Sequence, residues 1–92
     1  MIIRWLHLAE KDLDDLFAFI ARESPALAEK EVERVIGEVG RLQSHPAMGR
    51  PGRVADTREL VIPPYIVAYR VKSSTVQVLR VLHSAQEWPE NL

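Results

Sequence analysis

Midway along this chain the spacing of the apolar residues changes from a helical to a strand pattern, and that change constrains the fold more than any other feature. Two stretches before residue 45 repeat their apolar side chains at the helical spacing of three and four residues. Three stretches after residue 56 are rich in Val, Ile, Leu and Tyr, which is typical of strands. A short apolar run at residues 2–6 predicts one earlier strand. Strands and helices segregated in this way are typical of an α+β fold.

The two helices have clear boundaries in the sequence. We expect the first from residue 8 to about 23 and the second from about 25 to 44. Between them, Ser24 suits an N-cap, and Pro25 suits the first helical position because its missing N–H would be unpaired there anyway. The pair is therefore expected to form an αα-hairpin. Two glycines inside the second helix weaken it, which predicts a close backbone approach at those positions.

The second half of the chain predicts a loop and three strands. Residues 45–56 contain two prolines and two glycines and are expected to form a basic loop. The strands are expected at residues 57–62, 65–72 and 75–83, separated by Pro63-Pro64 and Ser73-Ser74. The last run is almost continuously apolar, which indicates a central strand buried on both faces. The expected architecture is β-α-α-β-β-β, a single domain of residues 1–92 with a helical hairpin packed on an antiparallel sheet.

Composition limits the cellular compartment. The chain has no cysteine and no run of about 18 apolar residues. Small secreted domains usually need disulfides, and a membrane helix needs about 20 apolar residues, so neither class is indicated. The first residues also lack the basic and apolar segments of a signal peptide. We expect a cytoplasmic protein with no membrane partner.

The charges divide the chain into two halves. Residues 1–46 carry a net charge of −3, and residues 47–92 carry a net charge of +2. A focused basic surface favours an anionic partner. An intramolecular alternative is equally open, in which the basic half docks on the acidic half.

No motif for a metal or a nucleotide is present. The three histidines are far apart, none has a second ligand at helical or hairpin spacing, and there is no cysteine. The run Gly49-Arg50-Pro51-Gly52-Arg53 is rich in glycine but lacks the Gly-Lys-Ser/Thr ending of a P-loop. Two interpretations remain for Arg50 and Arg53. They contact an anionic partner, or they are part of a solvated turn. We expect no metal and no cofactor.

The last strand carries an arginine and ends in a histidine. An unpaired buried charge is costly, so Arg80 either lines a groove or pairs with Glu59, Asp12 or Asp15. Glu59 itself is expected to form a structural ion pair. His83, beside arginines, can serve as general acid or base on a ribose hydroxyl, or it can simply hydrogen-bond the C-terminal tail.

Two tyrosines are four residues apart in the expected strand 65–72. Tyr65 and Tyr69 therefore share one strand face with Val67 and Val71. Aromatic side chains beside basic residues can stack on bases, but a face shared with two valines is typical of a core. We expect all four side chains in the core.

Six short motifs follow one another along nearly the whole chain. They are Ala9-x-x-Asp12-Leu13, Ser24-Pro25-x-x-Ala28, Pro46-x-x-Gly49-Arg50-Pro51-Gly52-Arg53, Thr57-Arg58-Glu59-Leu60, Tyr65-Ile66-Val67-Ala68-Tyr69-Arg70-Val71, and Val78-Leu79-Arg80-Val81-Leu82-His83 with Trp88-Pro89. Each is weak alone, but the ordered set resembles the RelE/ParE superfamily of type II toxins. The resemblance implies the β-α-α-β-β-β fold. It also implies a hetero-oligomer with a cognate antitoxin, whose flexible tail wraps the toxin.

The superfamily that the chain resembles has two activities. RelE-like members cleave mRNA on the ribosome, whereas ParE-like members poison DNA gyrase and are not nucleases. RelE-like members typically have an arginine after the first tyrosine of the Tyr-x-x-x-Tyr strand, basic residues after the last strand and a strongly basic overall charge. The corresponding features here are Ile66, Ser84-Ala85-Gln86-Glu87 and a net charge of −1. The resemblance therefore favours a ParE-like inhibitor of DNA gyrase.

The candidate site residues follow from these alternatives. The residues expected to contact the antitoxin or the target are Arg50, Arg53, Arg58, Arg70, Arg80, His83 and Trp88. A ParE-like toxin needs no catalytic residue. In the RelE-like alternative, a ribosome-dependent mRNA endoribonuclease, His83 is the acid/base group and Arg58, Arg70 or Arg80 clamps the phosphate. A third hypothesis is a degenerate toxin that only binds its antitoxin.

Overall fold

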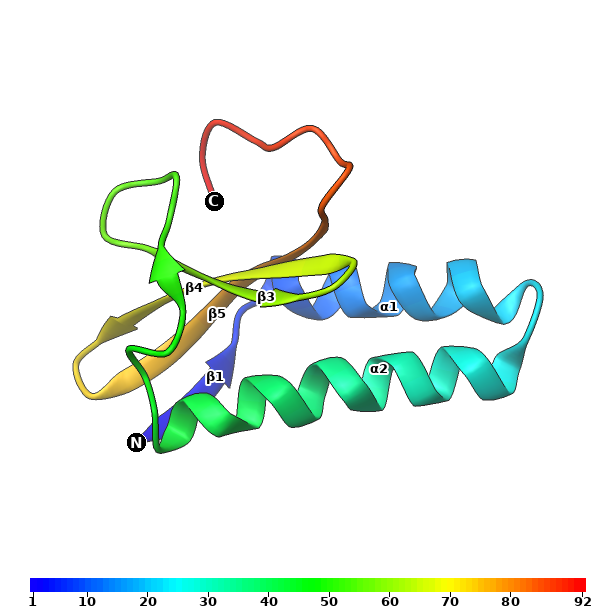
Figure 1. The fold of residues 1–92 in the computed structure, drawn as a ribbon, viewed down its shortest axis with the longest axis horizontal. Helices are drawn as coiled ribbons and strands as arrows, with labels where there is room; N and C mark the ends of the chain where they lie inside the picture. Colours follow the sequence, from blue (N-terminus) through cyan, green and yellow to red (C-terminus); the bar gives the residue numbers. More distant parts are fainter.

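The computed structural model describes residues 1–92 and packs two helices against one face of a five-stranded sheet (Figure 1). The elements are β1 (Ile2–Trp5), α1 (His7–Ala21), α2 (Pro25–Gly40), a 3-10 turn η1 (Arg41–Gln43), β2 (Arg50–Pro51), β3 (Arg58–Ile62), β4 (Tyr65–Lys72) and β5 (Thr75–His83). The predicted order of strands and helices is confirmed, and β2 is a short addition inside the predicted loop. Neither helix is long and apolar enough to cross a membrane.

The strands lie in the order β1-β5-β4-β3-β2. β3, β4 and β5 form the predicted antiparallel meander, but β1 pairs with β5 in parallel, so the sheet is mixed. The prediction of a wholly antiparallel sheet missed this pairing because an apolar period identifies a strand without giving its direction or its neighbour. Ser73 and Ser74 join β4 to β5 with φ of 52° and 58°, the signs of a type I′ turn.

The helical hairpin is held at its turn as predicted. Ser24 Oγ accepts a hydrogen bond from the Leu27 N–H at 3.1 Å, and Pro25 takes the first helical position. The expected close approach at Gly37 and Gly40 is wrong, since a Cβ at either position would meet no atom within 4 Å. α2 also ends earlier than predicted and tightens into η1.

The main core lies between the helices and the sheet. Its buried members are Ala9, Val35, Val39, Leu42, Leu60, Ile62, Tyr65, Val67, Tyr69, Val76, Val78 and Val81. The prediction of Tyr65, Val67 and Tyr69 as core residues is confirmed. The prediction for Val71 is wrong, because the β4–β5 hairpin extends beyond the helices and leaves this side chain 44% exposed (Figure 1).

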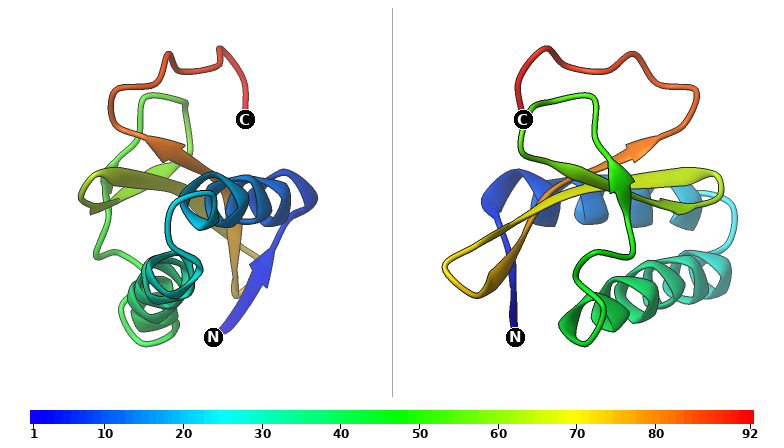
Figure 2. Two further views of the ribbon diagram at one scale, coloured as in Figure 1. Left: turned by 90° about the vertical axis from the view of Figure 1, so that its right-hand side faces the viewer. Right: turned by 60° about the vertical axis from the view of Figure 1, so that its left-hand side comes forward.

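The opposite face of the sheet is buried in part, although Val61, which pairs with Ile66 on this face, is 47% exposed. Ile66, Ala68, Leu79 and Leu82 are at most 6% exposed and do not belong to the helix-side core. The 50–57 loop and the tail, residues 84–92, pass over this face, on the side away from the helices (Figure 2). β5 is therefore buried on both faces, as its apolar run predicted.

Candidate functional site

Glu59 on β3 organises the arginine-rich loop. It is the only buried charged residue, at 2% exposure. The Arg50 guanidinium donates to Glu59 Oε1 through Nε at 3.2 Å and Nη2 at 3.0 Å. The Arg53 backbone N–H donates to Oε2 at 2.8 Å. β2 makes this possible because it pairs Arg50 directly opposite Glu59. The expected structural ion pair of Glu59 is confirmed.

Arg53 also links the loop to the tail. Its guanidinium lies 4.1 Å from the centre of the Trp88 ring, within cation–π range. The side chains of Arg50 and Arg53 are 53% and 52% exposed, so each keeps part of its guanidinium available to solvent or a partner. The Nε1 atom of Trp88 is buried and has no hydrogen-bond acceptor.

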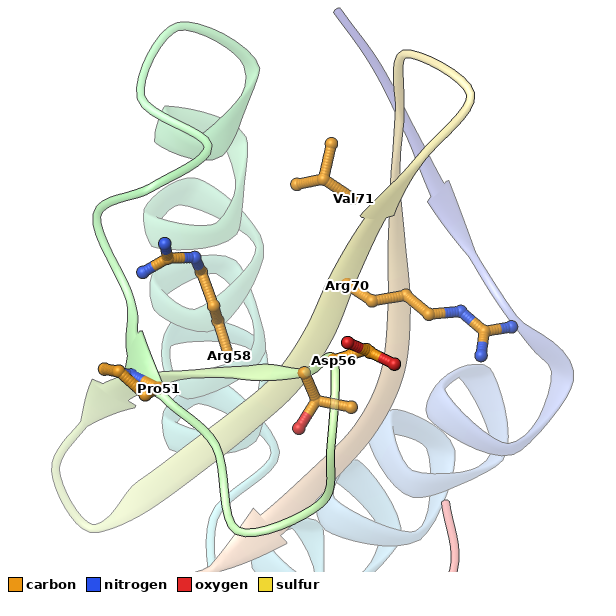
Figure 3. Close-up of a pocket in the computed structure, with 6 residues that line it drawn as sticks. Pro51, Asp56, Arg58, Arg70 and Val71 are labelled. Atoms are coloured by element: carbon orange, nitrogen blue, oxygen red, sulfur yellow. The ribbon is translucent and has the colours of Figure 1, made fainter.

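Arg58 and Arg70 line a shallow hollow of about 270 Å³ (Figure 3). Arg58 Nη1 donates to the Gly49 carbonyl at 2.8 Å, and Arg70 Nε donates to Gln77 Oε1 at 2.6 Å. The two side chains extend in opposite directions, and Asp56 lies between them (Figure 3). They do not converge on one point where both could clamp the same phosphate.

Arg80 is tied to the first helix. Its Nε and Nη2 donate to the two Asp12 carboxylate oxygens at 2.8 and 3.1 Å, and the Val81 N–H donates to Asp12 Oδ2 at 2.9 Å. The hydrogen-bonded Asp12 carboxylate raises the pKa of Arg80 above its ordinary value. Among the three predicted partners, Asp12 is the one in contact. It also satisfies the edge of β5 beyond Val78, the last residue paired with β1.

His83 lies exposed at the end of β5, with its ring edge-to-face against Tyr65 at 6.0 Å. Its Nδ1 accepts a hydrogen bond from the Ala85 N–H at 3.1 Å, so the structural alternative for this histidine, a bond to the tail, is present. His83 lines a second hollow of about 430 Å³ between α1 and the end of β5.

The three candidate nuclease residues do not share a cleft. Arg58 pairs with Tyr69, whereas His83 pairs with Tyr65, four residues away along β4. Four residues of strand span about 13 Å. Arg58 lines the first hollow, His83 lines the second, and Arg80 is bound by Asp12. Nowhere do three His, Cys, Asp or Glu side chains gather in a way that would hold a metal ion.

Tyr69 fixes the start of the loop. Its hydroxyl donates to the Pro46 carbonyl at 2.7 Å and accepts from the Gly49 N–H at 2.9 Å. A Cβ on Gly49 would lie 2.6 Å from this hydroxyl, so only glycine fits there. Burial raises the pKa of Tyr69, and burial followed by the Glu31 charge raises the pKa of Tyr65.

The sequence did not reveal the most exposed aromatic residue of the helices. Phe19 on α1 is 71% exposed and borders the hollow that contains His83. A signal was present, because Phe19 falls outside the apolar stripe of its helix. Exposed aromatic side chains of this kind are common in interaction surfaces.

Comparison with known proteins gives consistent results. Residues 3–88 match the family described as ParE toxin of type II toxin-antitoxin system, parDE. Y4kP of Sinorhizobium fredii, named as a candidate toxin, is 44% identical over 92 residues, covering 98% of this chain and 95% of that protein. Toxin RelE2 of Caulobacter vibrioides is 32% identical over 83 residues, covering 89% and 93%.

Two solved structures share the fold. A chain of the chromosomal ParDE toxin–antitoxin system from P. aeruginosa has a TM-score of 0.81 and 30% identity, covering 90% of this chain and 95% of that one. A chain of the toxin–antitoxin complex RelBE2 from Mycobacterium tuberculosis has a TM-score of 0.60 and 28% identity, covering 89% and 95%. The family match covers nearly the whole length of the chain. This chain belongs to the ParE toxin family of type II toxin–antitoxin systems.

Proposed function

We propose that a cognate antitoxin neutralises this toxin and that its target is DNA gyrase, as in the ParE-like branch. The two structural neighbours are toxin–antitoxin systems, which supports an antitoxin partner. The higher TM-score is that of the ParDE chain, which supports the ParE-like branch.

One observation carries the choice of a binding toxin over a nuclease. The candidate acid/base group His83 and the candidate clamp Arg58 line different hollows, and Arg80 is held by Asp12. General acid–base catalysis needs its groups within hydrogen-bond reach of the same reacting atoms. The separation of these residues supports an action by binding alone.

The test is expression of the chain from a tightly repressed promoter in bacterial cells. We expect growth arrest and an SOS response, with mRNA that stays uncut when mapped by primer extension. Purified protein should also inhibit supercoiling by gyrase. Codon-phased mRNA cuts without an SOS response would overturn the gyrase target. Absence of growth arrest would favour the degenerate toxin.

A matched pair of variants sharpens the test. His83→Gln removes the candidate acid/base group but keeps a hydrogen-bond acceptor for the exposed Ala85 N–H. Arg22→Ala changes a cation at the far end of the helical hairpin and serves as the control. Loss of general acid–base catalysis costs about 10²–10⁴-fold in rate, whereas in a binding toxin His83→Gln alters a single candidate contact and should reduce toxicity by less than about tenfold. Arg22→Ala should keep its toxicity within about twofold in either case.

The RelE-like activity is the second candidate, supported by the 32% identity to toxin RelE2. In that case His83 acts on the ribose hydroxyl, and closure around mRNA on the ribosome brings an arginine to it. The same primer-extension experiment decides between the two targets.

A further inference from the structure

One face of α1 presents an aromatic ring beside a carboxylate to solvent. Asp15 and Phe19 are four residues apart in this helix, so their side chains are neighbours on the same face. The Asp15 side chain is 65% exposed, and Phe19 is 71% exposed. Neither belongs to the core cluster between the helices and the sheet. The fold therefore leaves both side chains available to a partner.

This face of α1 forms one wall of the hollow of about 430 Å³ beside the end of β5, which we call the α1 hollow. Its strand side is buried, with Tyr65 and Val81 at 8% and 7% exposure. Its apolar lining consists of Leu16, Phe19, Tyr65 and Val81, and its carboxylates are Asp12 and Asp15. A side chain that enters from solvent therefore meets an apolar surface on the strands and a carboxylate on the exposed helix.

The helix that forms this wall is acidic. It carries four carboxylates against a single lysine, Lys11, which gives it a formal charge of −3 with its histidine neutral. Its acidic residues are Glu10, Asp12, Asp14 and Asp15. The exposed arginines of the second half, among them Arg50 and Arg53, lie on β2 and the loop that follows it. An anionic surface of this kind attracts a cationic partner.

Asp15 is the carboxylate of the α1 hollow that a partner can reach. Asp12 is not free, because its two oxygens accept hydrogen bonds from Arg80 and from the Val81 N–H. Asp15 accepts one hydrogen bond, from Lys11 Nζ at 2.9 Å, and the Lys11 side chain is 61% exposed. Solvent screens exposed pairs of this kind, so a second cation can replace Lys11 at little cost.

We propose that the α1 hollow is the contact through which the toxin holds its target, and that it receives a lysine or arginine side chain from a basic segment of that protein. The aliphatic stem of this side chain packs on the apolar lining. Its ammonium or guanidinium group lies against the Phe19 ring and pairs with Asp15. The inference rests on the proposed function for the identity of the target, DNA gyrase.

The chemistry of the α1 hollow favours a protein over a nucleic acid. A phosphate backbone needs free cations, and the two cations beside the hollow, Lys11 and Arg80, are both paired with carboxylates of α1. A cation held over an aromatic ring is a recurring mode of recognition, and aromatic residues often carry much of the binding energy of a protein interface. The ring and the carboxylate together select a positively charged side chain.

The first measurement is binding of the full chain to immobilised gyrase holoenzyme by surface plasmon resonance. Phe19→Ala should weaken binding about tenfold, as expected for a central aromatic residue. Asp15→Asn should weaken it about three- to fivefold, the range of an exposed charge pair. Both side chains are exposed, so both variants should fold, which far-ultraviolet circular dichroism and urea unfolding verify.

Two matched controls come from another side of the same helix. Phe17→Ala removes the same ring two residues away, about 200° around the helix axis. Asp14→Asn removes the same charge from a residue that borders a different hollow, with Trp5 and Ile36. Both controls should bind gyrase within about twofold of the natural chain, since they leave the α1 hollow unchanged.

Lys11 provides a change of opposite sign. Lys11→Ala and Asp15→Asn break the same exposed pair, but the first frees the carboxylate and the second removes its charge. Lys11→Ala should therefore bind gyrase about twofold more tightly than the natural chain. A role of the pair in helix stability alone would move both variants in the same direction. Added salt should also weaken binding of the natural chain more than binding of Asp15→Asn.

Growth arrest on expression tests the inference independently of the identity of the target. Phe19→Ala and Asp15→Asn should be less toxic than their controls, Phe17→Ala and Asp14→Asn. Growth arrest by the natural chain without binding to gyrase would overturn the gyrase target, and the same order of toxicity would still support the α1 hollow. A natural chain that neither arrests growth nor binds gyrase would overturn both proposals.

Three results would overturn the inference while the gyrase proposal stands. The first is equal binding to gyrase by Phe19→Ala, Asp15→Asn and the two controls. The second is a dimer that Phe19→Ala converts to a monomer of full toxicity in sedimentation velocity, because a second copy would then occupy the hollow. The third is a fully toxic Phe19→Ala that the co-expressed cognate antitoxin no longer neutralises, because the antitoxin would then be the occupant.

Discussion

The two faces of the sheet are covered by different means, and the side away from the helices is covered less completely. The helix side is covered by α1 and α2, and its contact is a continuous apolar cluster that includes Val35, Val39 and Leu42. The other side is covered by a loop and an irregular tail, held by Glu59 and by the Arg53–Trp88 contact. The helix side thus depends on close packing, whereas the tail side depends on a few exchangeable polar contacts.

This difference indicates that the two sides of this small domain have different roles. A packed helical layer is slow to open, because opening it exposes much apolar surface at once. A tail with few hydrogen bonds opens at small cost, which is what a surface for a partner requires. The arginines follow the same division, since Arg80 is tied to Asp12 on the helix side while Arg50 and Arg53 stay half exposed on the other.

The largest expected contrast comes from equal deletions on the two sides. Leu42→Ala removes a fully buried side chain of the helix-side core, and we expect a loss of about 3–4 kcal/mol in the free energy of unfolding. Leu79→Ala on the tail side should cost about 2 kcal/mol, because the tail can settle into the space. Urea unfolding measures both. Equal losses would show that the tail packs as firmly as the helices.

The ion pair on the helix side should matter next. Asp12→Ala leaves Arg80 and the Val81 N–H without a partner at a site where both side chains are under 20% exposed. We expect a loss of about 3 kcal/mol in unfolding free energy. Lys11→Ala breaks the exposed Lys11–Asp15 pair one residue away and should leave the unfolding free energy nearly unchanged, because solvent screens this pair. A small effect of Asp12→Ala on the free energy of unfolding would show that the helix side is stabilised by packing alone.

The corresponding change on the tail side should cost less. Glu59→Gln keeps the shape of the side chain but removes its charge, and the half-exposed Arg50 and Arg53 are then hydrated by water. We expect a loss of about 1.5–2 kcal/mol. Trypsin should also cleave after Arg53 faster in the variant, because the loop loses its anchor. A loss as large as that of Asp12→Ala would contradict the division between the faces.

Alkaline pH should produce the smallest effect, and only through the helix side. Burial raises the pKa of Tyr65 and Tyr69 in the folded protein, so the unfolded chain ionises first, near pH 10. Stability is therefore complete below about pH 10 and is lost as the pH rises from there through the folded pKa. The loss per tyrosine between pH 9 and pH 10.5 is at most about 0.8 kcal/mol, the limit set by ionisation of the unfolded chain. Urea unfolding of Tyr69→Phe should show a shallower dependence on pH, and an unchanged slope would contradict the assignment.

Much of the fold could be predicted from the sequence because its signals are local. Ser24 and Pro25 mark the helix turn, and the strands β4 and β5 were predicted with their observed bounds. A charge within an apolar strand needs a partner of opposite charge on a neighbouring element. The sequence therefore limited the partner of Arg80 to Glu59, Asp12 or Asp15. The separation of Arg58 from His83 was not predictable, since it depends on how the strands are aligned.

What the sequence determined by itself was the set of elements and the family, through periodicity, caps and an ordered set of motifs. Only the tertiary structure decided that Glu59 gathers two arginines, that Asp12 takes Arg80, and that Trp88 reaches back to Arg53. The reason is physical. Local propensity acts over a few residues, whereas the Arg80–Asp12 contact joins groups 68 residues apart, whose meeting depends on strand order and on the path of the chain between them.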